Sequence, residues 1–270
     1  MLKSYLFIPG DIQKYINNTK NILADYFVFD LEDSVSKDNK QTAFENIKKL
    51  DIKNNYFIRI PFFEKHYTKS QISFLIQYFE GRIVIPKIKN INDLENVLSI
   101  NSDQVDFSMI LLVENPKCFI NLKEILGTYD SLITAVGFGS HDFCTTMKMK
   151  HNLNTLKHYK KQLILLTKAY EKSYIDTVDL NLSDFSNFSD ECIYAFENGA
   201  DAKFIIHPFQ LDQIKSIIYF SEDEMNQMKK VFNIIQSYGD NDIDVFKVDG
   251  VVYEKPHVLR ITEIFKKLNL

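Results

Sequence analysis

Cysteine is scarce in this 270-residue sequence, and Cys118, Cys144 and Cys192 lie far apart. They form no Cys-x-x-Cys pair, and no histidine pair stands near them at the spacing of zinc ligands. An odd number of widely separated cysteines also excludes a disulfide framework as the basis of the fold. We therefore expect three reduced thiols that are mostly packed in the interior.

The sequence also has few arginines, no tryptophan and no long apolar run. Only three of the 32 basic residues are arginines, tryptophan is absent, and the formal net charge is −4. Without a basic stripe or a base-stacking platform, a nucleic-acid partner is excluded, and the aromatic residues are better explained by core packing. The apolar stretch before Pro9 is too short for a signal peptide or a membrane span. We expect a cytoplasmic protein that acts on a small molecule and does not bind a membrane.

Short apolar runs alternate with amphipathic segments along the chain, which is typical of βα repeats with a parallel sheet. Eight runs are candidate strands: 5–9, 26–31, 56–60, 82–86, 109–114, 133–137, 174–178 and 203–207. Helices are expected near 11–23, 37–50, 67–79, 91–98, 118–126, 154–172, 188–198 and 208–219. Eight such units predict an α/β fold, a TIM (β/α)8 barrel over residues 1–220. An acidic helix start at Ser221–Glu224 predicts a C-terminal helical extension or lid over residues 221–270.

Acidic residues stand at the ends of several predicted strands, where a β/α barrel has its chemistry. Glu114 and Asp142 end neighbouring strands and are our candidate ligands for a hard divalent cation, Mg²⁺. The alternative is that each acid caps the following helix or pairs with a lysine. Gly137 and Gly139, with Phe138 between them, favour close approach of the backbone to a ligand, so we predict that this segment binds substrate.

Arg59 ends the third predicted strand, where this chain would ordinarily use lysine. A planar, bidentate donor at that point suggests recognition of a carboxylate or an enolate oxygen, and an ion pair with Asp30 or Glu32 inside the barrel is compatible with this role. For Asp30 and Glu32 we expect a supporting role beside the site. Lys87, after Pro86, is a further candidate for contact with substrate.

Two of the six histidines, His141 and His207, follow predicted strands. A metal-ligand or acid/base role is open to both. A hydrogen-bonded, partly buried structural histidine is the alternative that we favour.

Seven short motifs in order resemble those of the citrate lyase β-subunit-like branch of the HpcH/HpaI aldolase superfamily. They are Lys3-Ser-x-Leu-Phe-Ile-Pro9-Gly10, Asp30-Leu-Glu32-Asp33-Ser-Val, Ile58-Arg59-Ile60, Ile85-Pro86-Lys87, Leu112-Val-Glu114, Gly139-x-x-Asp142-Phe and Ile206-His207-Pro208-x-Gln210. The resemblance implies an oligomeric β/α barrel that uses Mg²⁺ to make or break a carbon–carbon bond through an enolate. It also implies malyl-, citramalyl- or citryl-type thioesters as substrates, Glu114 and Asp142 as metal ligands, and Arg59 as the substrate anchor.

The C-terminal segment Asp249-Gly250-Val-Val-Tyr-Glu254-Lys-Pro256 resembles a family segment that can close over a neighbouring subunit's site. Glu254 stands where the family has aspartate, so the same acid lies on a longer stem. Lys3 stands where the family has arginine, and Pro61 stands where it has asparagine. The residues after Asp142-Phe lack the family's Leu-Gly ending. These departures leave the substrate and the use of a CoA thioester open.

We hypothesise a Mg²⁺-dependent carbon–carbon lyase or aldolase that acts on a 3-hydroxy-carboxylic acid or its thioester. Arg59 would stabilise charge on the substrate oxygen, and Glu254, or water held by Asp30 and Glu32, would move the proton. The residues assigned to catalysis are Arg59, Glu32 and Glu254, and those assigned to substrate are Arg59, Asp30, Lys87, Gly137, Phe138 and Gly139. A metal-dependent thioester hydrolase and a non-catalytic ligand-binding or assembly barrel are the alternatives. We expect a homo-oligomer, a trimer or a hexamer.

Overall fold

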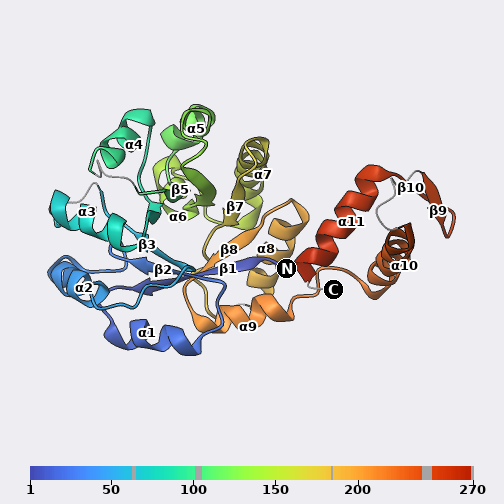
Figure 1. Ribbon diagram of the computed structural model, residues 1–270, viewed down its shortest axis with the longest axis horizontal. Coiled ribbons are helices and arrows are strands. Elements are labelled where there is room, and N and C mark those ends of the chain that lie inside the picture. Colours follow the sequence, from blue (N-terminus) through green and yellow to red (C-terminus); the bar gives the residue numbers. More distant parts are fainter. Residues whose placement is uncertain (63–64, 101–104, 184, 239–244, 269–270) are drawn as a thin grey trace. The chain divides into compact units, whose positions relative to one another are not determined.

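The computed structural model describes residues 1–62, 65–100, 105–183, 185–238 and 245–268 (Figure 1). It divides into two compact units, Leu2–Ile217 and Ile218–Leu270. The predicted end of the barrel at residue 220 lies close to this division. No helix in the described ranges is long and apolar enough to cross a membrane, and the cytoplasmic location stays a prediction.

The first unit is a closed barrel of eight parallel strands, which confirms the predicted TIM barrel (Figure 1). The last strand pairs with the first, since Tyr5 lies opposite Phe204. The strands are β1 (Lys3–Pro9), β2 (Tyr26–Asp30), β3 (Tyr56–Arg59), β4 (Arg82–Ile85), β5 (Ser108–Val113), β6 (Ile133–Phe138), β7 (Ser173–Asp176) and β8 (Ala202–Ile205). All eight coincide with the predicted runs, because strands of a parallel barrel are buried and read as apolar segments.

Helices follow the strands, as expected for βα repeats. They are α1 (Gln13–Asn18), α2 (Lys40–Ile47), α3 (Lys69–Tyr78), α4 (Ile91–Leu98), α5 (Pro116–Thr128), α6 (Ser140–Met147), α7 (Leu153–Ala169), α8 (Phe185–Glu197) and α9 (Pro208–Ser216). Short 3₁₀ turns lie at Thr19–Asn21 and Lys37–Asn39. The sequence analysis missed α6, whose buried positions are Ser140, Phe143 and Cys144 alone. Two apolar positions in eight residues give no clear helical periodicity.

The barrel interior is filled with side chains. Its core cluster contains Val28, Val84, Ile110, Ile175 and Phe204, each at most 2% exposed. At Gly137 in β6, an added methyl group would lie 2.5 Å from the Phe204 ring and 2.7 Å from Leu112. The missing side chain at Gly137 therefore makes room for packing inside the barrel.

In its described residues, the second unit contains two helices and a hairpin. These are α10 (Glu222–Tyr238), β9 (Phe246–Val248), β10 (Val251–Tyr253) and α11 (Lys255–Leu268), around a core of Val231, Val248, Ile261 and Phe265. Asp249 and Gly250 join the strands, both with positive φ (50° and 83°), as a two-residue hairpin turn requires. At the start of α10, Ser221 and Glu224 exchange hydrogen bonds in a capping box. The predicted helical start is confirmed.

Candidate active site

The carboxyl ends of β4, β5 and β6 border a cavity of about 360 Å³. Glu114, which follows β5, and Asp142, in the first turn of α6, both line it, together with Lys87 and Asn115. Parallel strands bring their ends to one rim of a barrel, so residues distant in sequence meet there. The two predicted metal ligands thus share one cavity.

Glu114 is 5% exposed, and one of its carboxylate oxygens accepts a 2.9 Å hydrogen bond from the backbone N–H of Lys87. Its side chain lies over Gly139, where an added methyl group would be 2.3 Å from Glu114 Cγ. Burial, followed by the negative charge of Glu32, raises the pKa of Glu114 to about 8, and Asp142 adds to this shift. Such crowding of negative charge is what a bound divalent cation would relieve.

Lys87 adopts a left-handed backbone conformation, with φ +60°, directly after Pro86. This uncommon conformation for a residue with a side chain accompanies the bond from the Lys87 amide to Glu114. Lys87 Nζ forms ion pairs with Glu32 and, at 3.0 Å, with Asp33. Burial opposes the charge of Lys87, but the hydrogen bonds to these carboxylates outweigh it and raise the pKa of Lys87. Lys87 therefore contacts both acids: its side chain pairs with Glu32, and its backbone N–H donates to Glu114.

Arg59, at the end of β3, forms a bidentate ion pair with Asp30: Nε lies 2.7 Å from one carboxylate oxygen and a terminal nitrogen 2.5 Å from the other. Its other terminal nitrogen lies 3.1 Å from Glu32, and the guanidinium stands 5.0 Å from the centre of the Phe7 ring. Arg59 is held rigidly, with 12% of its side chain exposed. The ion pair anticipated from the sequence is present.

The two acids beside Arg59 have opposite pKa shifts. Asp30 is buried, but the charge and hydrogen bonds of Arg59, with backbone donors at Ser34 and Glu32, outweigh burial and lower its pKa. At Glu32 burial prevails over the charge of Arg59 and raises the pKa to about 7. Arg59 thus favours the ionised form of Asp30, whereas Glu32 can gain or lose a proton near neutral pH.

The carboxylate pair Glu114 and Asp142 fits a hard divalent cation. Carboxylate oxygens are the ligands that Mg²⁺ prefers, and water and substrate usually complete its coordination. Asp142 is exposed and lines the cavity, whereas Glu114 is buried. In the part of the chain that the structure describes, no cluster of three or more histidine, cysteine, aspartate or glutamate side chains could hold a metal ion. Glu114 and Asp142 stay the two predicted metal ligands.

The other predicted substrate residues lie where side-chain packing dominates. Asp30 is 1% exposed, and Arg59 and backbone donors occupy both its oxygens. Phe138 is 1% exposed and packs edge-on against Phe143, with ring centres 5.3 Å apart. Gly137 faces Phe204, and Gly139 faces Glu114. At both glycines an added methyl group would meet a neighbouring side chain, and the substrate contact expected for Gly137, Phe138 and Gly139 stays a prediction.

Glu254 belongs to the unit Ile218–Leu270, where it follows β10 and is exposed. Its backbone N–H donates to Nδ1 of His257. The acid/base role predicted for Glu254 stays a prediction. Of the two strand-end histidines, His207 caps α9, since its Nδ1 accepts from the backbone N–H of Phe209 at 3.1 Å.

A polar network beside Asp142 escaped the sequence analysis. The buried Ser140 hydroxyl bonds to Thr177 and, at 2.8 Å, to Nε2 of His151. The His151 ring stacks on His141 at 3.8 Å between centres. These residues come from three separate places in the chain, and no local spacing marks them. They fix the first turn of α6, which carries Asp142.

Thr177 is in turn held by a buried ionic cluster behind β7 and β8. Its carbonyl accepts from Lys203 Nζ at 2.9 Å. Lys203 also lies 3.2 Å from Asp176 and from Glu191, and Lys160 lies 3.0 Å from Asp176. The wall of the barrel that supports α6 is therefore held by paired charges.

Comparison with known proteins gives one family and full-length relatives. The HpcH/HpaI aldolase/citrate lyase family model matches residues 3–208. Citrate lyase subunit beta of Leuconostoc mesenteroides subsp. cremoris is 23% identical over 282 residues, covering 99% of this chain and 93% of that protein. A (3S)-malyl-CoA thioesterase of Cereibacter sphaeroides (strain KD131) is also 23% identical, over 98% of this chain and 94% of that protein.

Among solved structures, protein CitE from Mycobacterium tuberculosis, in complex with magnesium, acetoacetate and coenzyme A, has a TM-score of 0.82 at 17% identity. It covers all of this chain, which in turn covers 98% of it. Because the family model spans most of the barrel, the chain belongs to the HpcH/HpaI aldolase/citrate lyase family.

Proposed function

We propose that this protein is a Mg²⁺-dependent lyase that breaks or forms a carbon–carbon bond in a 3-hydroxy-carboxylic acid or its thioester. The observation that carries the proposal is the Arg59 guanidinium, fixed by Asp30 on the same barrel rim as the Glu114 and Asp142 carboxylates. Relatives that include citrate lyase β subunits and a citramalyl-CoA lyase support it.

Glu114 and Asp142 are the residues that would hold Mg²⁺. Solved relatives in complex with magnesium and acetoacetate, oxaloacetate or pyruvate support this assignment. When bound, Mg²⁺ would act as a Lewis acid on a substrate oxygen. The amide of Lys87 orients Glu114 from one side, and Gly139 gives its side chain room on the other.

Arg59 would bind the substrate carboxylate or the oxygen on which negative charge develops. A guanidinium has five N–H groups, of which two donate to Asp30, and a third nitrogen lies 3.1 Å from Glu32 as an ion pair. Because Asp30 stays ionised, it holds Arg59 in one orientation before substrate arrives. A preorganised donor of this kind typically contributes about 2.7–4 kcal/mol to transition-state stabilisation.

Glu32 is the group in this cluster best suited to move a proton. Its pKa of about 7 lies near the pH at which an enzyme works, as an effective general acid or base requires. Lys87 and Arg59 hold the Glu32 carboxylate on both sides. Glu254 stays a second candidate for proton transfer, and closure of residues 221–270 over a neighbouring subunit rests on the family resemblance.

A thioester hydrolase is the second candidate, because the (3S)-malyl-CoA thioesterases are as similar to this chain, at 23% identity, as the citrate lyase subunit. The same cation and guanidinium would serve thioester hydrolysis by water. A non-catalytic barrel is the third reading, and the intact Arg59, Glu114 and Asp142 argue against it.

Product analysis separates these functions. We would incubate the protein and Mg²⁺ with (3S)-malyl-CoA or citramalyl-CoA and identify products by mass spectrometry. A lyase yields an acyl-CoA and an aldehyde or keto acid, whereas a hydrolase yields a free acid and a thiol. Hydrogen exchange at the methyl group of pyruvate in D₂O tests enolisation without a thioester. Absence of product and of exchange, equal to a Glu114→Gln control, would favour the non-catalytic barrel.

A further inference from the structure

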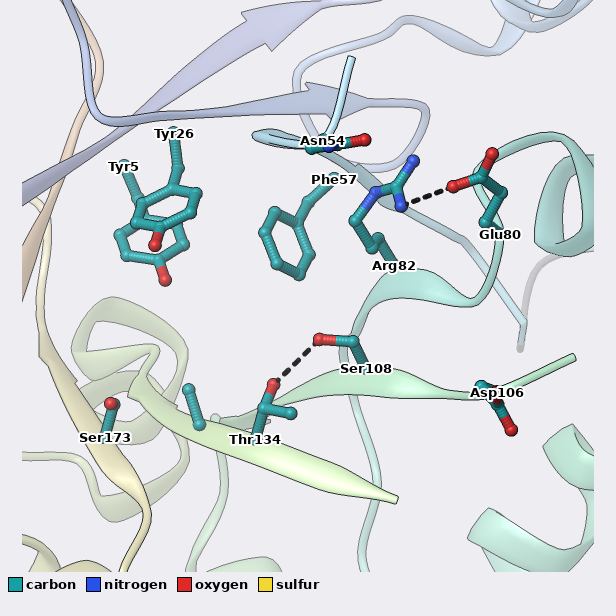
Figure 2. A pocket seen from close by; sticks show the side chains of 11 residues that line it. Tyr5, Tyr26, Asn54, Phe57, Glu80, Arg82, Asp106, Ser108, Thr134 and Ser173 are labelled. Atoms are coloured by element: carbon teal, nitrogen blue, oxygen red, sulfur yellow. Dashed lines mark hydrogen bonds and ion pairs between the residues drawn. The ribbon is translucent and has the colours of Figure 1, made fainter. Parts of the chain in front are cut away.

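A second cavity, of about 430 Å³, lies at the amino ends of the barrel strands, opposite the rim that carries Glu114 and Asp142 (Figure 2). The strand β1 supplies Tyr5, β2 Tyr26, β3 Phe57, and β5 to β7 supply the facing wall. Its size lies within the range of small-molecule sites. No residue proposed above for the reaction takes part in it.

Tyr5 and Tyr26 form one wall of this cavity. Their rings stack with centres 4.4 Å apart at 16°, and Figure 2 shows both hydroxyl groups pointing into the open space. Tyr5 is 8% exposed, its hydroxyl forms no hydrogen bond to another described residue, and this oxygen is not among the fully buried polar atoms that lack a partner. The Tyr5 hydroxyl is therefore free to bond to a molecule in the cavity.

The facing wall carries three more hydroxyl groups. Ser108 and Thr134 bond to each other at 3.2 Å across β5 and β6, the Thr134 hydroxyl also bonds to the carbonyl of Met109 at 3.3 Å, and Ser173 begins β7 (Figure 2). Hydroxyl groups act as both donors and acceptors, so both walls can bond to the same kind of group. The floor between them is apolar, formed by Phe57 and the barrel core.

Charge among the residues that line the cavity argues against an anionic ligand, although Lys3 Nζ lies 5.9 Å from the centre of the Tyr26 ring. Arg82 is committed to Glu80, at 2.7 Å, and to the carbonyl of Tyr56, at 3.2 Å. Asp106 adds a negative charge at the rim. Burial, then the nearby Tyr26, and then Asp25 raise the pKa of Tyr5, which keeps its hydroxyl protonated and able to donate.

The turn before β4 shapes this rim. Glu80 and Gly81 both have positive φ, 52° and 75°, and an added methyl group at Gly81 would lie 2.5 Å from the carbonyl oxygen of Asp106. This close approach requires glycine. The turn brings Arg82, Glu80 and Asp106 to one side of the cavity, away from the tyrosine wall.

We propose that the amino-terminal mouth of the barrel binds a neutral, hydroxyl-rich small molecule of about monosaccharide size. Such a ligand bonds to Tyr5 and Tyr26 on one side and to Thr134 and Ser173 on the other, and its carbon skeleton rests on Phe57. The cavity walls supply hydroxyl groups to both of its faces. This inference is independent of the proposed reaction.

The test uses the full chain, with myo-inositol and glucose as probes and glucose 6-phosphate as the anionic comparison. Isothermal titration calorimetry and two-dimensional NMR measure binding. We expect both neutral probes to bind and glucose 6-phosphate to bind more weakly. Tyr5→Phe and Thr134→Val should each weaken binding about five-fold, the effect of one hydrogen bond.

The matched control is Tyr15→Phe, which removes a hydroxyl from a half-exposed tyrosine on α1 outside the cavity. Thermal unfolding of each variant verifies that the fold is intact. Because the Tyr5 hydroxyl has no partner in the described residues, Tyr5→Phe should not lower the melting temperature. Failure of both neutral probes to bind the wild type, equal binding of the phosphate ester, or unchanged affinity in Tyr5→Phe would overturn the proposal.

Discussion

The Glu114 side chain occupies the space that a side chain at residue 139 would need: a methyl group there would lie 2.3 Å from Glu114 Cγ. Residue 139 is therefore glycine because the Glu114 side chain passes through the space that a larger residue would fill. A glycine at the end of β6 and an acid at the end of β5 form one unit, and each constrains the other.

Gly139→Ala should displace Glu114 and weaken Mg²⁺ binding about 10–100-fold, the range found when groups that orient metal ligands are changed. Calorimetric titration with Mg²⁺, or electron paramagnetic resonance of bound Mn²⁺, measures the loss. Gly127→Ala is the control. A methyl group at that position in α5 would lie 3.4 Å from its nearest neighbour, the Tyr170 hydroxyl, which is an ordinary van der Waals contact. Equal metal affinity in the two variants would contradict the predicted role of Gly139.

The contribution of Glu114 to the stability of the metal-free protein should fall as the pH rises from about 5 to 8. The raised pKa of Glu114, about 8, means that the folded protein binds this proton more tightly than the unfolded chain does. The associated stability is fully present below the ordinary glutamate pKa and is lost as the pH rises through the folded value. Melting curves should show that Glu114→Gln reduces this slope. Mg²⁺ should stabilise the wild type more at pH 8 than at pH 6, and the reverse order would refute the assignment.

Arg59→Lys should lower kcat about 10²–10³-fold, because lysine is a point charge that cannot keep the two-pronged pairing with Asp30 while it binds substrate. Steady-state kinetics with whichever thioester proves to be turned over measures the change. Arg260→Lys, at an exposed position on α11, should leave kcat within two-fold. Full activity of Arg59→Lys would exclude the role assigned to the guanidinium.

Ser140→Ala should weaken Mg²⁺ binding about ten-fold, although Ser140 lies behind the ligands. The variant removes the hydroxyl that joins Thr177 to His151 and so loosens the turn that carries Asp142. Metal titration of folded protein separates this effect from lost stability. The exposed Ser99→Ala is the control, and an affinity equal to that of the wild type would show that Ser140 only supports the fold.

The eight strands and the acids at their ends could be predicted because that information is local. A buried strand is apolar along its length, and parallel strands bring their ends to one rim. The helix α6 could not be predicted from the sequence, since its buried positions include a serine. The contacts of Gly137 with Phe204, and of Ser140 with Thr177, join residues far apart in the chain, and only folding brings them together.

Lys203→Met should destabilise the barrel by about 3–5 kcal/mol, because it leaves the buried carboxylates of Asp176 and Glu191 without this partner. Denaturant unfolding measures the change. Lys168→Met removes a partly exposed pair with Asp201 and should cost about 1 kcal/mol or less. Similar losses in both variants would mean that burial of the Lys203 cluster does not govern its contribution.

The filled interior of the barrel has a consequence for inhibitor design. A packed layer of buried side chains separates the two ends of the barrel; it includes Val28, Ile110, Ile175 and Phe204. A compound lodged beside Tyr5 cannot compete sterically with one held by Arg59. Compounds for the two ends of the barrel can therefore be sought, and combined, separately.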